Sequence, residues 1–536
     1  MPPSSPPSPS EPESSEPPKS FESPANAPSS SRSSTEGAGW GGQETGTYPQ
    51  LMPARVANLS WLDPGTLWKA RNGPLASLFG DPTGEQRGQW VHRQVESGAA
   101  GADLLIERDD PGTFSFLLLG DTGEGDAPQY AVVPGLLKAG AGTRYAVLCS
   151  DVLYPVGDGN EYGTKFFRPY QDYDAPIYPI PGNHDWYDGL TGFMRVFCDA
   201  PALPAAPRPR AGSAAWWRSL LWRGPEVIDE ERLAQARRLR DRPAQAARHP
   251  GPYWAMDSGP LRIIGIDTGL LGRIDREQGE WLARVARGPR PKILVTGSPI
   301  YVDGVHHPCP IDGGGTVDAI VRDPDNHFVA AIGGDIHNYQ HYPVDVDGRR
   351  IEYVVSGGGG AFMHATHTIP PVTVGGVTED RFRCYPLRAD SLAFYSRLYG
   401  RRLHLRRLFD LTPGQAAAVI AARLGITPAR PSAEPVTRRA RFVASVLGVA
   451  ARPGSRRRIR LPVRRMLTRV LSPGSATYTP PFFKSFLRLD VTPEAVRVRC
   501  FAATGLREHE IDPPVEDDFT IALPAAAPVP APRAAR

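Results

Sequence analysis

The sequence predicts an α/β fold, built on a mixed and largely parallel sheet that helices cover on both faces. Two observations support this prediction. Between about residues 112 and 360, short apolar runs recur, and each ends abruptly in a polar loop that contains Gly or Asp. Helical stretches lie between several of these runs. Strands that alternate with helices are typical of a sheet that is buried on both faces.

The predicted strands are recognised by their length and by their β-branched or aromatic content. They are FSFLLL at 114–119, YAVLC at 145–149, PIYPI at 176–180, KILV at 292–295 and HFVAAI at 327–332. Residues 275–287 predict a helix, because Ile274, Trp281, Leu282 and Val285 form an apolar stripe. In such sheets, functional sites form at the carboxyl ends of strands. Every polar loop that follows these runs falls at such an end.

The remaining segments suggest how the chain is organised around this core. We expect disordered, Ser- and Pro-rich tails at 1–48 and 524–536, because they contain too few large apolar residues to offset the entropy of ordering. The expected order between them is an N-terminal extension that packs on the core (49–111), the core itself (112–374) with an insertion at 200–250, an Arg-rich helical region (375–480), and C-terminal strands that complete the core (481–523). The insertion should contain a helix at 229–240.

The composition is that of a soluble globular protein with a sizeable core, at 40 % hydrophobic and 22 % charged residues. The net charge of +4 is too small to indicate nucleic-acid binding by itself. The five cysteines are scattered without a CxxC pair, which argues against a disulfide framework and a zinc ribbon. There is no signal-peptide pattern and no apolar run near the ~18 residues that span a bilayer. We therefore expect a cytoplasmic protein.

The loops after the predicted strands carry carboxylate, amide and imidazole side chains beside glycines. In order, they are Gly120-Asp121-Thr122-Gly123, Ser150-Asp151-Val152-Leu153-Tyr154, Gly182-Asn183-His184-Asp185, Gly297-Ser298 and Gly334-Asp335-Ile336-His337. These are the donors that divalent or trivalent metals take. A single GDxG is usually a turn, but the joint occurrence indicates a metal site. A central carboxylate could bridge two ions ~3.5–4 Å apart.

This set of loops resembles the calcineurin-like metallophosphoesterase superfamily, and specifically its purple acid phosphatase-like pattern of GDxG, GDxxY, GNH(D/E), VxxH and GHxH. This chain matches it as GDxG, xDxxY, GNHD and GDxH. The resemblance covers about residues 112–360, and PGNHDWYDGL also resembles a branch of large bacterial and plant relatives. It implies a four-layer α/β/β/α sandwich of two mixed sheets flanked by helices. It also implies hydrolysis of a phosphoester by attack of metal-bound hydroxide, at a centre of two metal ions or of one.

Carried over residue by residue, the resemblance places Asp121, Asp151, Tyr154 and His337 in a first metal site. A tyrosinate ligand would favour Fe(III), and a core tyrosine is the alternative interpretation of Tyr154. The second site would take Asp151 as a bridge and Asn183 through its amide oxygen. The implied cofactors are two divalent or trivalent ions, of Fe, Mn or Zn.

The second site departs from the family pattern at two positions. Ser298 stands where the pattern has a histidine, and Asp335 replaces the first histidine of GHxH. Asp335 remains a competent ligand for Mn²⁺, Mg²⁺ or Fe, whereas a serine is a poor one. Nearby histidines could replace the missing imidazole ligands. The candidates are His306 and His307, and also His364 and His367. The alternative is that these are loop histidines that contact substrate or solvent.

The resemblance gives His184 a catalytic role outside the ligand set. It would face the phosphate and stabilise the transition state or protonate the leaving oxygen. Asp185 would orient His184 and hold it cationic.

Other functions remain open at this point. The chain could be a non-hydrolytic metal-binding scaffold, because two imidazoles of the pattern are missing. The Arg-rich region 397–469 could instead bind an anionic membrane or nucleic acid, or hold a polyanionic substrate near the metals, or be a solvated basic face. Its arginines include Arg401, Arg402, Arg406, Arg407, Arg456, Arg457, Arg458, Arg464 and Arg465. The sequence does not identify the phosphoester substrate or the oligomeric state.

Overall fold

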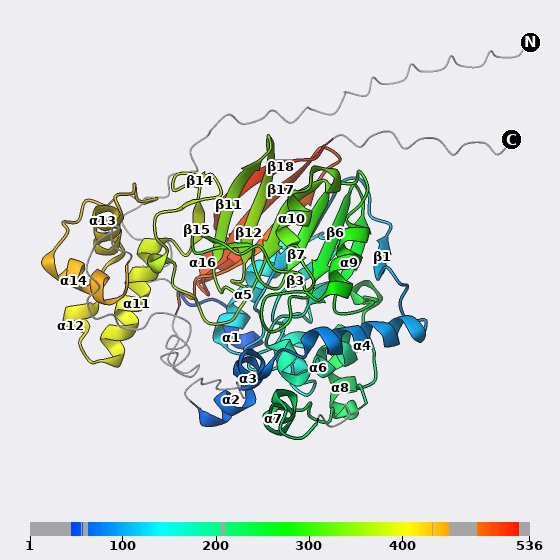
Figure 1. The fold of residues 1–536 in the computed structure, drawn as a ribbon. Coiled ribbons are helices and arrows are strands. Elements are labelled where there is room, and N and C mark those ends of the chain that lie inside the picture. Colours follow the sequence, from blue (N-terminus) through cyan, green and yellow to red (C-terminus); the bar gives the residue numbers. More distant parts are fainter. Residues whose placement is uncertain are drawn as a thin grey trace, which may run out of the picture.

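A computed structural model of the chain describes residues 44–54, 56, 63–204, 210–430, 432–449 and 480–524. Two mixed sheets pack face to face, and helices cover their outer faces (Figure 1). The tails predicted at 1–48 and 524–536 lie almost wholly outside the described residues. The part of the Arg-rich region from 450 to 479 also lies outside them.

The first sheet has six strands in the order β18-β17-β16-β2-β3-β4. Its parallel half consists of the predicted strands β2 (Phe114–Leu119), β3 (Ala146–Cys149) and β4 (Ile177–Ile180). Its antiparallel half consists of β16 (Lys484–Val491), β17 (Ala495–Ala503) and β18 (Val515–Ala522). β16 pairs directly with β2, so a strand from the last described segment, 480–524, lies beside the first predicted strand.

The second sheet has eight strands in the order β1-β5-β6-β7-β10-β12-β11-β15. They are β1 (Leu105–Arg108), β5 (Trp254–Ser258), β6 (Leu261–Ile266), β7 (Lys292–Thr296), β10 (Phe328–Gly333), β11 (Tyr339–Val346), β12 (Arg349–Ser356) and β15 (Arg383–Tyr385). Its centre, β6-β7-β10-β12, is parallel. Two short hairpins lie outside it: β8 (Tyr301–Val302) with β9 (Val305–His306), and β13 (Thr373–Val374) with β14 (Val377–Thr378).

The alternation of side chains along β2 explains the layers. Phe116 and Leu118 point into a core shared with the second sheet, whereas Leu117 and Leu119 face the helix α5 (Ala127–Ala139). On the second sheet, α9 (Arg276–Val285) and α10 (Val317–Arg322) cover the outer face. The predicted four-layer α/β/β/α arrangement of two mixed sheets flanked by helices is therefore confirmed.

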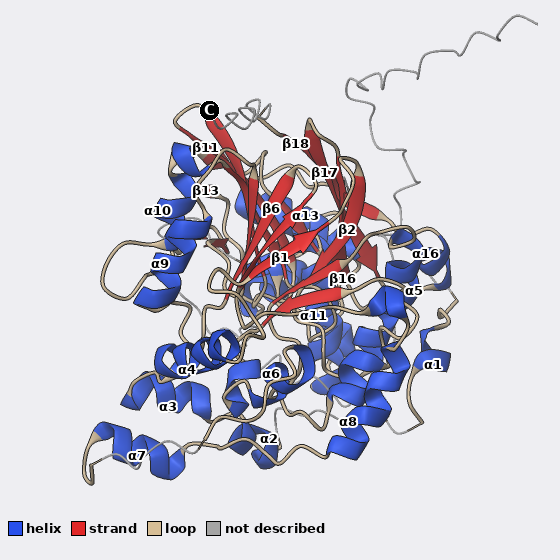
Figure 2. Ribbon diagram, turned by 90° about the vertical axis from the view of Figure 1, so that its right-hand side faces the viewer, coloured by secondary structure: helices blue, strands red, loops and turns tan. Residues whose placement is uncertain are grey.

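Six further helices gather at one end of the sandwich, below the strands in Figure 2. They are α2 (Pro64–Lys69), α3 (Asn72–Phe79), α4 (Thr83–Glu96), α6 (Thr191–Phe197), α7 (Ala214–Leu221) and α8 (Glu230–Arg237). Short helices complete this part and the sheet edges: α1 (Tyr48–Leu51), η1 (Gly163–Phe167), η2 (Asp185–Asp188), η3 (Arg238–Arg240), η4 (Pro243–Gln245), η5 (Pro324–Asn326) and α16 (Arg507–Ile511).

A separate group of helices lies beside the sandwich, at the left of Figure 1. It consists of α11 (Arg388–Arg402), α12 (Arg406–Phe409), α13 (Pro413–Leu424) and α14 (Arg438–Val446). His367, in the short helix η6 (Thr366–Thr368), ties this group to the core. Its ring nitrogens lie 2.8 Å from the Ser391 hydroxyl and 3.0 Å from the Leu447 carbonyl. Burial lowers the pKa of His367 to about 4, so this candidate ligand is a neutral core histidine.

The five cysteines, all within described segments, carry free thiols. The described helices are each too short or too polar to cross a membrane.

Candidate metal centre

The predicted polar residues follow the carboxyl ends of parallel strands from both sheets. Asp121 follows β2, Asp151 follows β3, Asn183 and His184 follow β4, Ser298 follows β7, and Asp335 and His337 follow β10. These ends lie at one edge of the sandwich, so residues up to about 200 positions apart come together.

The hydroxyl of Tyr154 lies at the centre of this group. It is 2.9 Å from Asp121 Oδ1, 2.8 Å from Asp151 Oδ2 and 3.0 Å from His337 Nε2. All four side chains are almost fully buried. A phenol has one hydrogen to donate, so it cannot satisfy two carboxylates at once. A shared cation would satisfy all four groups.

The electrostatics of the group also favour a cation. Burial raises the pKa of Asp121 and of Asp151 well above the usual range, and the negative charge of Asp335 raises both further. The pKa of Tyr154 is raised in the same way, by burial and then by the charges of Asp121 and Asp151. Several acidic groups in a buried space repel one another, and a bound positive charge would relieve this repulsion.

Two buried oxygens point to the same conclusion. Asp121 Oδ2 and Asn183 Oδ1 are inaccessible to solvent, and neither has a hydrogen-bond partner among the described residues. Buried polar atoms are normally paired, because an unpaired one costs about 1–3 kcal/mol. Asp121 is a predicted ligand of the first metal site and Asn183 a predicted ligand of the second. Each site therefore has a buried oxygen that a metal ion would satisfy, so the donor set fits the ions that the resemblance implies.

The backbone is strained where it delivers two of the carboxylates. Asp121 and Asp335 have φ angles of 59° and 62°, in the left-handed region that favours glycine. The glycines nearby allow close approach: a Cβ on Gly334 would overlap the Cys149 carbonyl, and one on Gly182 would overlap Asp151. Strain of this kind persists at functional sites when the surrounding structure enforces it.

His337 is oriented by groups that the sequence did not identify as partners. Its Nδ1 lies 2.6 Å from the carbonyl oxygen of Phe362, which directs Nε2 towards Tyr154. Its backbone N–H donates to His364 Nδ1 at 3.0 Å, and the two imidazole rings stack with centroids 4.3 Å apart. His364, considered as a ligand from the sequence, is therefore placed behind His337. Phe362 acts through a main-chain atom, so the glycine-rich loop in which it lies is its one signal in the sequence.

His184 is buried beside the cluster, but Asp185 does not orient it as we expected. The Asp185 carboxylate instead accepts hydrogen bonds from the backbone N–H groups of Gly182, Val152 and Leu153, at 3.0, 3.0 and 3.3 Å. The Nδ1 atom of His184 lies 2.8 Å from the Pro155 carbonyl oxygen. The role predicted for Asp185 is corrected: it joins the loops after β3 and β4, and a main-chain carbonyl holds the imidazole.

The histidines suggested as replacements in the second site lie elsewhere. His306 Nε2 is 2.7 Å from the Asp318 carboxylate on α10, and its ring stacks on Tyr301. This places His306 on the outer face of the second sheet, away from the acidic cluster. The side chain of His307 is exposed. The Ser298 hydroxyl lies 3.3 Å from the hydroxyl of Thr268, which also accepts a hydrogen bond from the Ser298 N–H.

Across the described residues, no three His, Cys, Asp or Glu side chains converge closely enough to hold a metal ion. Asp121, Asp151 and His337 each contact the Tyr154 hydroxyl, which stands between them and keeps the three side chains apart from one another.

A buried ion pair that the sequence did not predict supports the loop after β4. Asp267 follows β6, and its carboxylate lies 2.8 Å from Arg87 Nε and accepts a hydrogen bond from Trp186 Nε1 at 2.9 Å. Arg87 and Asp267 are both buried. The two residues are 180 positions apart, and no motif in the sequence indicates that they pair.

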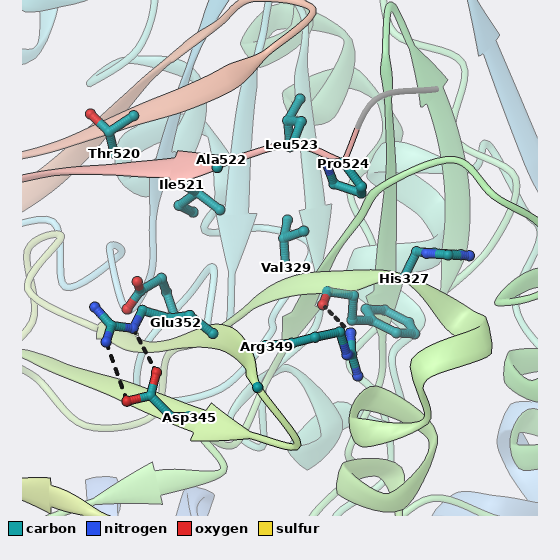
Figure 3. Close-up of a pocket in the computed structure, with 13 residues that line it drawn as sticks. His327, Val329, Asp345, Arg349, Glu352, Thr520, Ile521, Ala522, Leu523 and Pro524 are labelled. Carbon is teal, nitrogen blue, oxygen red and sulfur yellow. Dashed lines mark hydrogen bonds and ion pairs between the residues drawn. The ribbon is translucent and has the colours of Figure 1, made fainter. Parts of the chain in front are cut away.

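A wide cavity of about 610 Å³ lies at the opposite end of the sandwich (Figure 3). The start of β10, the β11–β12 turn and the end of β18 form its walls. Because the acidic cluster follows the end of β10, this cavity is separate from the candidate centre.

No family model and no curated protein sequence matches this chain. Among solved structures, the purple acid phosphatase PPD1 from yellow lupin (Lupinus luteus) seeds is similar with a TM-score of 0.34 and 11 % identity, over 77 % of this chain and 54 % of that one. PhoD is similar with a TM-score of 0.28 and 10 % identity, over 77 % and 73 %. GAP50, the anchor in the inner membrane complex of Plasmodium, has a TM-score of 0.27 and 12 % identity, over 47 % and 74 %. The chain thus spans about half the length of the lupin enzyme.

Proposed function

We propose that this protein is a metal-dependent phosphoesterase that hydrolyses a phosphoester at a centre of one or two metal ions. The observation that carries the proposal is the convergence of Asp121, Asp151 and His337 on the Tyr154 hydroxyl. Carboxylate, phenolate and imidazole together suit a hard or borderline metal ion.

The proposed first site uses Asp121, Asp151, Tyr154 and His337, with Fe(III) favoured by the tyrosinate. The proposed second site shares Asp151 and adds the buried Asn183 Oδ1 and Asp335, which would suit Mn²⁺, Mg²⁺ or Fe. Metal ions bound there would supply an activated water and would neutralise the charge on the phosphoryl oxygens.

His184 would act as the proton donor to the leaving oxygen. Its Nδ1 faces the Pro155 carbonyl at 2.8 Å, and a carbonyl can only accept, so this nitrogen carries a hydrogen. The second ring nitrogen, Nε2, is then the atom that can exchange a proton with substrate, and it donates one when the ring is the doubly protonated imidazolium. Its backbone N–H donates to Asp151 Oδ1 at 2.7 Å, which ties the imidazole to the proposed bridging carboxylate.

The non-hydrolytic scaffold remains the second candidate. The departures at Ser298 and Asp335 favour it, since the second site has lost two imidazoles. The retention of a buried imidazole at His184, next to the bridge, favours catalysis, because a single-metal scaffold does not need it.

The test is metal analysis of the purified protein, with hydrolysis of aryl phosphate monoesters and diesters in the presence of Mn²⁺, Fe or Zn²⁺. Asp151→Asn should lower the rate by at least about 100-fold, because it removes the shared ligand. Asp172→Asn, at an exposed carboxylate, is the matched control and should leave the rate unchanged. An Asp151→Asn protein as active as the wild type would refute the mechanism, and absence of turnover with every metal would favour the scaffold.

A further inference from the structure

The corner between α11 and α12 exposes arginines and leucines close together in the sequence. All eight residues from 401 to 408, RRLHLRRL, are exposed, with Leu403 at 44 % and Leu405 at 47 %. Helix α14 lies against this corner, since Arg439 donates a hydrogen bond to the Leu408 carbonyl. It adds the exposed Arg438, Arg441 and Phe442. We call these residues, 401–408 with 438, 441 and 442, the basic-apolar corner.

The charge of the corner has one sign. It carries six arginines: Arg401, Arg402, Arg406, Arg407, Arg438 and Arg441. Neither segment 401–408 nor segment 437–446 contains an aspartate or a glutamate. Asp410, which directly follows α12, is partly buried and interacts electrostatically with Arg397, Arg406, Arg401 and Arg439. The corner therefore presents a positive surface that would attract an anionic partner.

The apolar side chains indicate which anionic partner this is. Leu403, Leu405, Leu408 and Phe442 are all between 39 % and 49 % exposed, and they stand among the arginines rather than apart from them. Aliphatic side chains have no partner on a phosphodiester backbone, where binding depends on cations and on aromatic stacking. At a lipid surface, leucines enter the boundary of the acyl chains while arginines contact the phosphates above.

We propose that the basic-apolar corner binds the surface of a membrane rich in anionic phospholipid. This inference does not depend on the proposed hydrolysis, because it uses none of the metal-site residues.

The corner is connected to the candidate metal centre through buried contacts. The Tyr395 hydroxyl of α11 donates to the Met363 carbonyl at 2.7 Å, in the loop that also carries Phe362 and His364. His367 joins the same loop to Ser391 of α11. Membrane binding at the corner would therefore hold the metal centre at a fixed distance from the bilayer.

The test uses the full chain and phosphatidylcholine vesicles, with and without phosphatidylserine, in a sedimentation assay over a range of salt concentrations. The wild type should bind the phosphatidylserine vesicles, and less so as salt rises. Arg406→Gln with Arg407→Gln should lower the partition coefficient about 25-fold, at about five-fold for each arginine. Leu403→Ser with Leu405→Ser should lower it by roughly ten-fold while keeping the charge.

The matched control is Arg232→Gln with Arg238→Gln, which removes two exposed arginines from α8 and η3 and should bind as the wild type does. Circular dichroism should show the same melting curve for all variants. Three results would overturn the proposal: no preference of the wild type for phosphatidylserine, equal losses in the control and the corner variants, or tighter binding to a short DNA duplex than to the vesicles. Association of the protein with itself, abolished by the corner variants, would identify a second copy as the partner instead.

Discussion

Replacing Tyr154 by phenylalanine separates a metal ligand from a core tyrosine. The ring stays and only the hydroxyl is lost, together with its contacts to Asp121, Asp151 and His337 at 2.8–3.0 Å. In the metal-free protein, the hydroxyl can donate one hydrogen bond to a carboxylate. Its loss should lower the free energy of unfolding by about 1.5–3 kcal/mol in either interpretation.

The two interpretations differ in the effect of added metal. If metal is present at about 1,000 times its dissociation constant, it stabilises the wild type by about 4.1 kcal/mol. Loss of a direct ligand should weaken affinity at least as much as loss of an orienting partner, or about 100-fold. The same metal concentration would then stabilise Tyr154→Phe by about 1.4 kcal/mol. The difference, about 2.7 kcal/mol, is large enough to measure by urea unfolding with and without metal.

Tyr353→Phe is a matched control, because its buried hydroxyl donates to the Asp318 carboxylate at 2.6 Å, outside the centre. It should lose similar stability without metal and keep the full gain with metal. A Tyr154→Phe protein that also keeps the full gain would show that Tyr154 is not a ligand. With Fe(III), the wild type should in addition have a visible absorption band from the phenolate, which the variant lacks.

Two further predictions concern stability. His341 joins the two sheets, with its ring nitrogens 2.9 Å from Glu352 and 2.8 Å from Asp517; burial lowers its pKa, but these hydrogen bonds outweigh burial and raise it overall. The stability that protonated His341 provides is therefore complete below the unfolded pKa of about 6.5 and is lost as pH rises through the higher folded pKa. The free energy of unfolding, measured with urea, should decline above about pH 6.5, and His341→Gln should remove this decline. Asp185→Ala should lower the free energy of unfolding by about 3 kcal/mol, because three buried N–H groups lose their acceptor. Removal of the carboxylate offsets part of the loss, since burial is unfavourable for this group and raises its pKa to about 7. Activity should fall with stability, and an Asp185→Ala protein as stable as the wild type would contradict the joining of the two loops.

The parts of the fold that could be predicted are those in which local sequence and burial agree. The run FSFLLL became β2 residue for residue, because it is buried on both faces and ends at a glycine. The helix predicted at 275–287 begins one residue later, since the Asp275 side chain caps it by accepting from the Gln278 N–H at 2.8 Å. The strand β18, VEDDFTIA, lies inside the range 481–523 where C-terminal strands were expected, but its own pattern does not mark it as a strand. It is an edge strand with one partner, and three acidic residues in a row, at 516–518, interrupt its apolar alternation.

The candidate site shows the same division. Asp121, Asp151 and His337 could be expected to meet, because each follows a strand and parallel strands end at one edge. The acceptors that orient the two imidazoles could not, since the carbonyls of Pro155 and Phe362 are main-chain atoms that every residue possesses. Such contacts depend on how closely two loops approach, which the sequence of either loop does not contain.

The pairing of β2 with β16 has a consequence for the order in which the protein is made. β2 leads into the loop with Asp121, yet one of its two neighbours in the sheet is β16, and Ser115 and Arg488 are in contact although they are 373 residues apart. During synthesis, β2 leaves the ribosome long before β16 is made, so the edge of β2 that pairs with β16 stays without its partner strand until then. The loop at Gly358, behind His337, is likewise held by the Ser485 N–H at 2.9 Å. Contacts so distant in sequence form slowly. The centre can therefore assemble only late in translation, and shortened chains that stop before residue 484 should accumulate as inactive, aggregation-prone forms.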